Sequence, residues 1–140
     1  MVDYEDLTDE QQRAVDALDR NVTLDAGAGT GKTTTLTARY LAMFEESLRE
    51  HDATNGLGDA NGDEPKDGAT HLHPENVLTT TFTERAANDL EESIRGEITD
   101  RIDDLALEEF DAWRTIADDL EEGYIHTLHG FCSRLLREHA

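Results

Sequence analysis

The sequence predicts an α/β fold in which a parallel sheet is flanked by helices. Three short runs rich in β-branched residues occur at 22–24, 75–81 and 124–127, and each is followed by a stretch with helical apolar spacing. A glycine-rich turn, residues 27–31, joins the first run to its helix. Strands that alternate with helices favour a parallel sheet, whose ligands bind where the strands end. We therefore expect the functional residues in the turns that follow the strands.

Residues 7–18 (LTDEQQRAVDAL) precede the first strand and predict a short helix. Thr8 is a suitable N-cap, and Gln11 stands three residues later, which completes a capping box. One face of this helix carries Leu7, Gln11, Ala14, Val15 and Leu18. Gln11 either only caps the helix or reads an adenine edge with its amide, which has one donor side and one acceptor side. Its place just before the glycine-rich turn favours the second interpretation.

The segment 21–36 (NVTLDAGAGTGKTTTL) has the order strand, glycine-rich turn, Lys-Thr and helix that is typical of a P-loop. Glycines let backbone N–H groups approach phosphates, and a helix that starts at residues 31–32 adds its positive end. Lys32 reaches the β- and γ-phosphates and Thr33 ligates Mg²⁺ in this arrangement. A turn that binds nothing is the alternative, and the specific order disfavours it. The predicted nucleotide-binding residues are Gln11, Ala26, Gly27, Ala28, Gly29, Thr30, Gly31, Lys32, Thr33 and Thr34, with Lys32 and Thr33 catalytic.

Beyond the turn, the apolar spacing predicts a helix that continues through Thr37, Ala38, Tyr40, Leu41, Phe44 and Leu48. Residues 50–68 are rich in Gly, Asn and Asp and nearly free of apolar residues, so we expect a flexible acidic insertion over about 50–74. His51, His71 and His73 lack a second cluster of ligands, which favours solvated histidines over a metal site.

The second half predicts three more helices, at 84–98, 102–120 and 129–139. Thr83 is a plausible cap of the first, and Gly96 marks a kink or an end of it. The expected buried face of the second carries Leu105, Phe110, Trp113, Ile116 and Leu120.

The turns after the second and third strands should lie at the same sheet edge as the glycine-rich turn. The residues concerned are Thr81, Phe82, Thr83, Arg85, Thr127 and His129. An aromatic ring that stacks on a base, with hydroxyls and an Arg for phosphates, suits single-stranded nucleic acid. Taken alone, Phe82 is more often a core residue, and the resemblance described below favours stacking on a base instead.

Composition limits the class of protein. A chain of 140 residues is one domain or part of a larger one, and 36% hydrophobic content is on the low side. No stretch approaches the length of a membrane span, and the acidic N-terminus is neither a signal nor a transit peptide. A single cysteine, Cys132, excludes a disulfide framework and indicates a reducing, cytoplasmic setting.

The net charge of −21 is spread evenly, with −10 on residues 1–70 and −11 on residues 71–140. Only two lysines are present, Lys32 and Lys66. Such surfaces resemble those of halophilic proteins, whose self-repulsion is screened by molar salt. The alternative is a mesophilic acidic protein with basic partners. An even distribution favours the halophilic interpretation, because an interaction tail would form a block.

Four segments of the chain, named below in sequence order, resemble motifs of the UvrD/Rep-type superfamily 1 DNA helicases, closest to their RecB/AddA branch. LTDEQQRAV is similar to the Q motif, AGAGTGKT to motif I, TTFTERAANDL to motif Ia, and IHTLHGFCSRLLREHA to the motif that follows. Ala26 stands where the family typically carries alanine. Thr34 replaces an arginine that many relatives have there.

The resemblance implies that residues 1–140 are the N-terminal part of a RecA-like ATP-binding domain, one of two lobes of a DNA repair or recombination helicase. It implies ATP and Mg²⁺ as cofactors, movement along single-stranded DNA in the 3′ to 5′ direction, and, as a further partner, a nuclease domain or a separate nuclease chain. No strand ending in Asp-Glu follows residue 127, so we expect the fragment alone neither to hydrolyse ATP nor to unwind DNA. Another P-loop enzyme, such as a small-molecule kinase, or a non-catalytic nucleotide-binding module are the alternatives.

Overall fold

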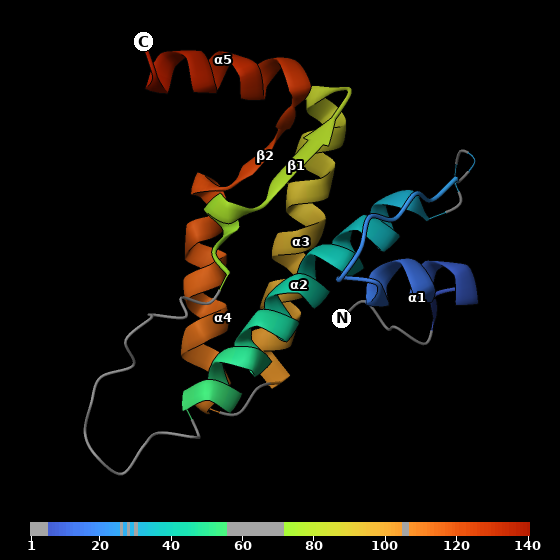
Figure 1. Ribbon diagram of the computed structural model, residues 1–140, viewed down its shortest axis with the longest axis vertical. Helices are drawn as coiled ribbons and strands as arrows, with labels where there is room; N and C mark the ends of the chain where they lie inside the picture. The colour runs from blue at the N-terminus through green and yellow to red at the C-terminus, as the bar shows by residue number, and fades with distance from the viewer. Residues whose placement is uncertain (1–5, 26, 28, 30, 56–71, 105–106) are drawn as a thin grey trace.

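Helices dominate the architecture, and the strands form one small sheet (Figure 1). The computed structural model describes residues 6–25, 27, 29, 31–55, 72–104 and 107–140. The elements in chain order are α1 (Asp9–Asp16), α2 (Lys32–Asn55), the 3₁₀ turn η2 (Pro74–Asn76), β1 (Leu78–Thr81), α3 (Glu84–Asp104), α4 (Leu107–Asp119), the 3₁₀ turn η3 (Leu120–Glu122), β2 (Tyr124–Thr127) and α5 (Leu128–Glu138).

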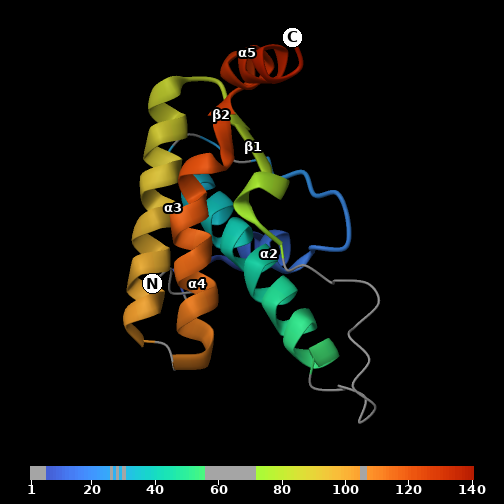
Figure 2. The ribbon, with the colours of Figure 1, turned by 90° about the vertical axis from the view of Figure 1, so that its left-hand side faces the viewer.

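A single large core joins α2, α3 and α4. Figures 1 and 2 show α3 and α4 side by side, with α2 crossing the pair. The helical spacing of apolar residues puts one stripe of each helix into the core, where burial supplies the main stabilisation. The buried residues are Tyr40, Leu41, Phe44, Leu90, Ile94, Ile98, Trp113, Ile116, Leu120 and Ile125.

The sheet consists of β1 and β2, which pair in parallel with Leu78 opposite Tyr124 and Thr81 opposite Thr127. The chain between the two strands forms α3 and α4, the long crossover that a parallel pair requires. Because the strands are parallel and in register, both end at the same edge of the sheet. Residues 82–85 and 128–130 therefore leave the sheet together.

The predicted strand at 22–24 is not formed. Residues 21–25 adopt no regular structure, and Val22 and Leu24 are 39% and 36% exposed. Strand formation depends on a neighbour that supplies hydrogen bonds and side-chain contacts, and the described sheet has only two strands. The strand prediction at 124–127 is confirmed over its whole length, and the one at 75–81 is confirmed at 78–81, because residues 74–76 form the 3₁₀ turn η2 instead.

Two helices are longer than predicted. α3 passes through Gly96 without ending and runs to Asp104, so it takes the start of the helix expected at 102–120. A glycine costs a helix only about 1 kcal/mol, and the buried Ile94 and Ile98 on either side outweigh it. α2 continues to Asn55, which lies within the segment expected to be flexible. At the end of this predicted segment, Leu72 packs against the core and Pro74 is buried. Residues 56–71 lie outside the described part of the chain.

Candidate nucleotide site and sheet edge

The glycine-rich turn has the backbone shape that its glycines permit. Gly29 and Gly31 have φ angles of 74° and 79°, in the left-handed region where other residues are strained. Lys32, directly after Gly31, is the first residue of α2, and Thr35 donates from its side chain to the Gly31 carbonyl at 2.9 Å. The first helical turn carries Lys32, Thr33 and Thr34, all exposed, while Gly27 is also exposed and Ala26, Ala28 and Thr30 lie outside the described residues.

Gln11 lies against this turn. A Cβ atom placed on Gly31 would stand 2.7 Å from Nε2 of Gln11, closer than real Cβ contacts allow. The same side chain caps α1, because its Oε1 accepts from the Thr8 backbone N–H at 2.9 Å and Thr8 Oγ1 accepts from the Gln11 N–H at 3.3 Å. The capping box is confirmed. Gln11 therefore caps the helix and faces the glycine-rich turn at the same time.

Arg39 fixes α1 along α2, a role that the sequence did not indicate. Its Nη2 donates to the Ala17 carbonyl at 3.0 Å and its Nη1 donates to the Ala14 carbonyl. A cation at the C-terminus of α1 also complements the negative end of the helix dipole. Val15 and Ala38 pack together between the helices. These contacts hold Gln11 at the end of α2 where the turn lies.

At the sheet edge, Phe82 is fully exposed directly after β1, so its interpretation as a core residue is wrong. Thr81 donates from its side chain to the Thr83 carbonyl at 3.0 Å, and Thr83 Oγ1 accepts from the Ala86 N–H at 3.1 Å as the cap of α3. Arg85 is exposed and stands 3.8 Å from Asp89, one turn along α3. The ring is thus presented to solvent, while both threonine hydroxyls shape the turn beneath it.

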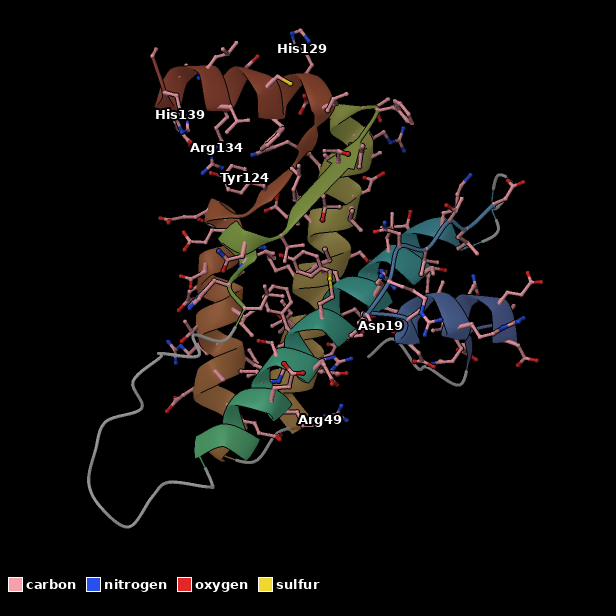
Figure 3. All side chains as sticks on the ribbon, viewed as in Figure 1. Asp19, Arg49, Tyr124, His129, Arg134 and His139 are labelled. Atoms are coloured by element: carbon pink, nitrogen blue, oxygen red, sulfur yellow. The ribbon has the colours of Figure 1, made fainter. Side chains whose placement is uncertain are left out.

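Thr127 and His129 follow β2 at the same edge but differ in exposure. Thr127 is buried, and its Oγ1 donates to Glu84 at 2.9 Å and accepts from the Gly130 N–H at 3.0 Å. It therefore ties β2 to the first turns of α3 and α5 rather than facing solvent. His129 is exposed on the first turn of α5 and points away from the sheet in Figure 3.

The expected common edge for the two sites is not formed. Figure 1 shows the start of α2 to the right of the bundle, whereas β1 and β2 end at its top. The reason is that residues 22–24 do not join the sheet, so nothing anchors the turn beside the other strand ends. The structure brings Gln11 to the glycine-rich turn and brings Phe82 to the same edge as His129, as two separate clusters.

Arg134 anchors α5 to β2 below the sheet edge (Figure 3). Its guanidinium lies 4.4 Å from the Tyr124 ring centroid and donates to Glu138 Oε1 at 2.8 Å. Arg134 Nη1 also lies 3.3 Å from His126 Nε2. The hydrogen bond from Arg134 lowers the pKa of Glu138 below its usual value. No residue of α5 is buried, so its attachment rests on these contacts and on the Phe131 ring, which lies edge-on to Tyr124 at a centroid distance of 5.7 Å.

Within the described ranges, no group of three or more His, Cys, Asp and Glu residues could hold a metal ion, and His73 lies 3.2 Å from Asp119. The Thr33 hydroxyl, exposed beside Lys32, suits Mg²⁺ bound together with phosphates, which keeps most of its ligands as water and phosphate oxygens. None of the helices in this part of the chain has the length and apolar character needed to cross a bilayer.

The comparisons with known proteins agree on one protein family. The profile of the UvrD/REP helicase N-terminal domain matches residues 7–54 and 68–140. The chain is 29% identical to the RecBCD enzyme subunit RecB of Haemophilus influenzae over 84% of its length, 30% identical to an ATP-dependent helicase/nuclease subunit of Exiguobacterium sibiricum over 94%, and 28% identical to the ATP-dependent DNA helicase PcrA of Bacillus subtilis over 91%.

These matches cover 10%, 9% and 12% of the three relatives, so the chain spans about a tenth of the length of the curated proteins that it matches. No solved structure gives a significant match.

Proposed function

Because the chain belongs to the UvrD/REP helicase N-terminal domain family, we propose that it is the ATP-binding part of an ATP-dependent DNA helicase. The observation that carries the proposal is the contact between the Gln11 amide and Gly31, one residue before Lys32. A group able to read a base edge thus lies beside a turn built for phosphates. The names of the relatives, which are ATP-dependent helicases and helicase/nuclease subunits, support the same function.

ATP with Mg²⁺ fits the residues that are present. The left-handed glycines open the turn, and the start of α2 adds its positive dipole end. Residues 26–34 would hold the phosphates, with Lys32 on the β- and γ-phosphates, Thr33 on Mg²⁺ and Gln11 on the adenine. When bound, Mg·ATP supplies the phosphoryl group whose transfer to water drives the motor. The chain's own part is to orient the triphosphate and to offset its charge.

Single-stranded DNA is the proposed second ligand, at the edge where β1 and β2 end. Phe82 would stack on a base, with Thr83, Arg85 and His129 beside the phosphates. Thr81 and Thr127 would act through the backbone geometry that their hydrogen bonds maintain. In this proposal a second RecA-like lobe outside these residues completes the motor, which moves 3′ to 5′ and works with a nuclease domain or a separate nuclease chain in repair or recombination.

The nucleotide part is tested with Gln11→Glu, because glutamate keeps the capping box but removes the amide donor. We expect ATP, measured by calorimetry, to bind about tenfold more weakly than in the control below, as one lost hydrogen bond predicts. Gln12→Glu is the matched control: it adds the same charge one residue away, on a side chain that bonds Asp16 instead. Equal affinity for ATP in the two variants would contradict the role of Gln11.

ATP hydrolysis by residues 1–140 alone gives a second test of the proposed function. We expect residues 1–140 to bind ATP without steady-state hydrolysis, because no Asp-Glu pair that could orient water occurs in residues 128–140 after β2. ATPase activity that Lys32→Ala abolishes would contradict this expectation.

The DNA part is tested with Phe82→Ala in the full-length protein. Stacking contributes roughly 1–3 kcal/mol per base, so we expect weaker binding of single-stranded DNA without loss of stability. Leu136→Ala removes a similarly exposed apolar side chain from α5 and is the control.

If the acidic chain works in molar salt, counterion release contributes little to DNA affinity. The loss of single-strand affinity in Phe82→Ala should then grow with salt concentration. An effect no larger at high salt than at low salt would count against the halophilic part of the proposal.

A further inference from the structure

We propose that the capping box of α1 sets nucleotide specificity, because the backbone N–H of Thr8 fixes which way the Gln11 amide faces. Thr8 is then a positioning residue for adenine recognition, although its own side chain bonds the first turn of α1. This inference rests on the proposed function and adds the source of its base selectivity.

The two ends of the Gln11 amide have different surroundings. Oε1 accepts from the Thr8 N–H at 2.9 Å, inside the capping box. Nε2 lies on the side of the glycine-rich turn, where a Cβ on Gly31 would stand 2.7 Å away. Oxygen and nitrogen of an amide are nearly equal in size, so only hydrogen bonds distinguish its two orientations. The Thr8 N–H supplies that distinction, since a flipped amide would place donor against donor.

An amide held in one orientation discriminates between purines. Adenine offers a donor at N6 beside an acceptor at N7, whereas guanine offers acceptors at both O6 and N7. One acceptor and one donor in fixed positions match adenine and oppose the guanine O6 to Oε1. Oε1 has two lone pairs, so its bond to Thr8 is compatible with a second bond from N6. An amide free to flip could turn its NH₂ group toward O6 and would accept guanine as well.

The backbone of Thr8 allows a direct test. Its φ of −67° and ψ of 159° suit proline, so Thr8→Pro removes the N–H while position 8 keeps its own backbone angles. Thr8→Ala is the matched variant: both substitutions delete the Oγ1 cap, and only proline deletes the N–H. The difference between them isolates the bond from Thr8 N–H to Gln11 Oε1.

We expect the ratio of GTP to ATP dissociation constants to be about tenfold lower in Thr8→Pro than in Thr8→Ala, as one lost hydrogen bond predicts. Binding of inorganic tripolyphosphate, which has no base, should be equal in the two variants. Equal ratios in the two variants, or a loss that falls equally on ATP, GTP and tripolyphosphate, would overturn the inference. If the unsubstituted protein bound no ATP, the proposed function would fail first.

A second measurement does not depend on proline being tolerated. Hydrogen exchange followed by NMR should show a protected Thr8 amide in the unsubstituted protein. Gln11→Ala should speed its exchange, whereas Gln12→Ala should not. A Thr8 amide that exchanges equally fast in all three proteins would show that the bond does not persist in solution, and the inference would fall.

Discussion

The bundle core and the two clusters with the proposed functional residues are held together in different ways. Ten buried residues from α2, α3, α4, η3 and β2 form the core, which excludes water over a large area. The contact between α1 and α2 has a small apolar cluster of Val15 and Ala38, with Leu7 and Ala42 packed against it, and no residue of α5 is buried. Apolar burial has no directional preference, whereas hydrogen bonds fix orientation. The fold's stability therefore resides in one region and the geometry of recognition in others.

Truncating a core side chain is expected to have the largest effect. Phe44 is completely buried in the core, and Phe44→Ala should lower the free energy of unfolding by about 3–5 kcal/mol through lost burial and a new cavity. Urea denaturation followed by circular dichroism measures it. Leu136→Ala, at a position 73% exposed on α5, should change the value by less than about 0.5 kcal/mol. Similar losses in the two variants would remove the contrast between core and periphery.

Breaking the Arg39 contact should loosen the docking of α1 on α2 without unfolding the bundle core. Arg39→Lys keeps the charge but cannot reach two carbonyls with a planar fork, and we expect a loss of about 1.5–3 kcal/mol that is confined to the docking of α1. Hydrogen exchange should speed in α1 and not in α3, and ATP binding should weaken. Arg49→Lys, at an exposed arginine paired with Glu46, is the control. Unchanged exchange in α1 would mean that the apolar contact alone holds it.

Tyr40 tests the effect of a polar group inside the apolar core. Its hydroxyl is buried and has no hydrogen-bond partner among the described residues, so Tyr40→Phe should raise the free energy of unfolding by about 1 kcal/mol. Burial, and then the charge of Glu91, raise the pKa of Tyr40. The unfolded chain therefore loses this proton first, and stability should fall as pH rises above the ordinary tyrosine pKa of 10.0. The extra alkaline loss should disappear in Tyr40→Phe, and its persistence would contradict the assignment.

The smallest effect is expected at α5. The hydrogen bond from Arg134 lowers the pKa of Glu138, so this pair adds stability above the ordinary value of 4.5, and the contribution is lost as pH falls through the lower folded pKa. Both side chains reach solvent, so the effect should appear as faster exchange of α5 amides at acid pH rather than as unfolding. Glu138→Gln should remove the pH dependence of that exchange. The same acid response in the variant would assign it to other carboxylates.

Local signals in the sequence predicted most of the helices. Thr8 and Gln11 marked the start of α1, and the apolar spacing predicted helices at 84–98 and 102–120 that overlap α3 and α4. These predictions succeed because capping and helical periodicity depend on residues three or four apart. Short β-branched runs predicted three strands, and two of them are present.

The sequence did not correctly predict features that depend on residues far apart along the chain. A strand at 22–24 needs a neighbour that its own residues cannot specify, and Gly96 stays helical because of burial across the bundle. The Arg39 bonds to backbone carbonyls leave no pattern in the sequence, because any residue supplies a carbonyl. The burial of Thr127 likewise follows from Glu84, which lies far along the chain. The assignments of Lys32, Thr33 and the residues for DNA stay predictions.

The two-stranded sheet has a consequence for the behaviour of the protein in solution. Among the described residues neither β1 nor β2 has a neighbour on its outer side, and Leu78 at the start of β1 is largely uncovered. Such open backbone rows invite strands from other molecules and promote aggregation. The net charge of −21 opposes this association, because copies of the chain repel one another before their strands can meet. Colloidal stability of this small sheet thus rests on the acidic side chains that surround it.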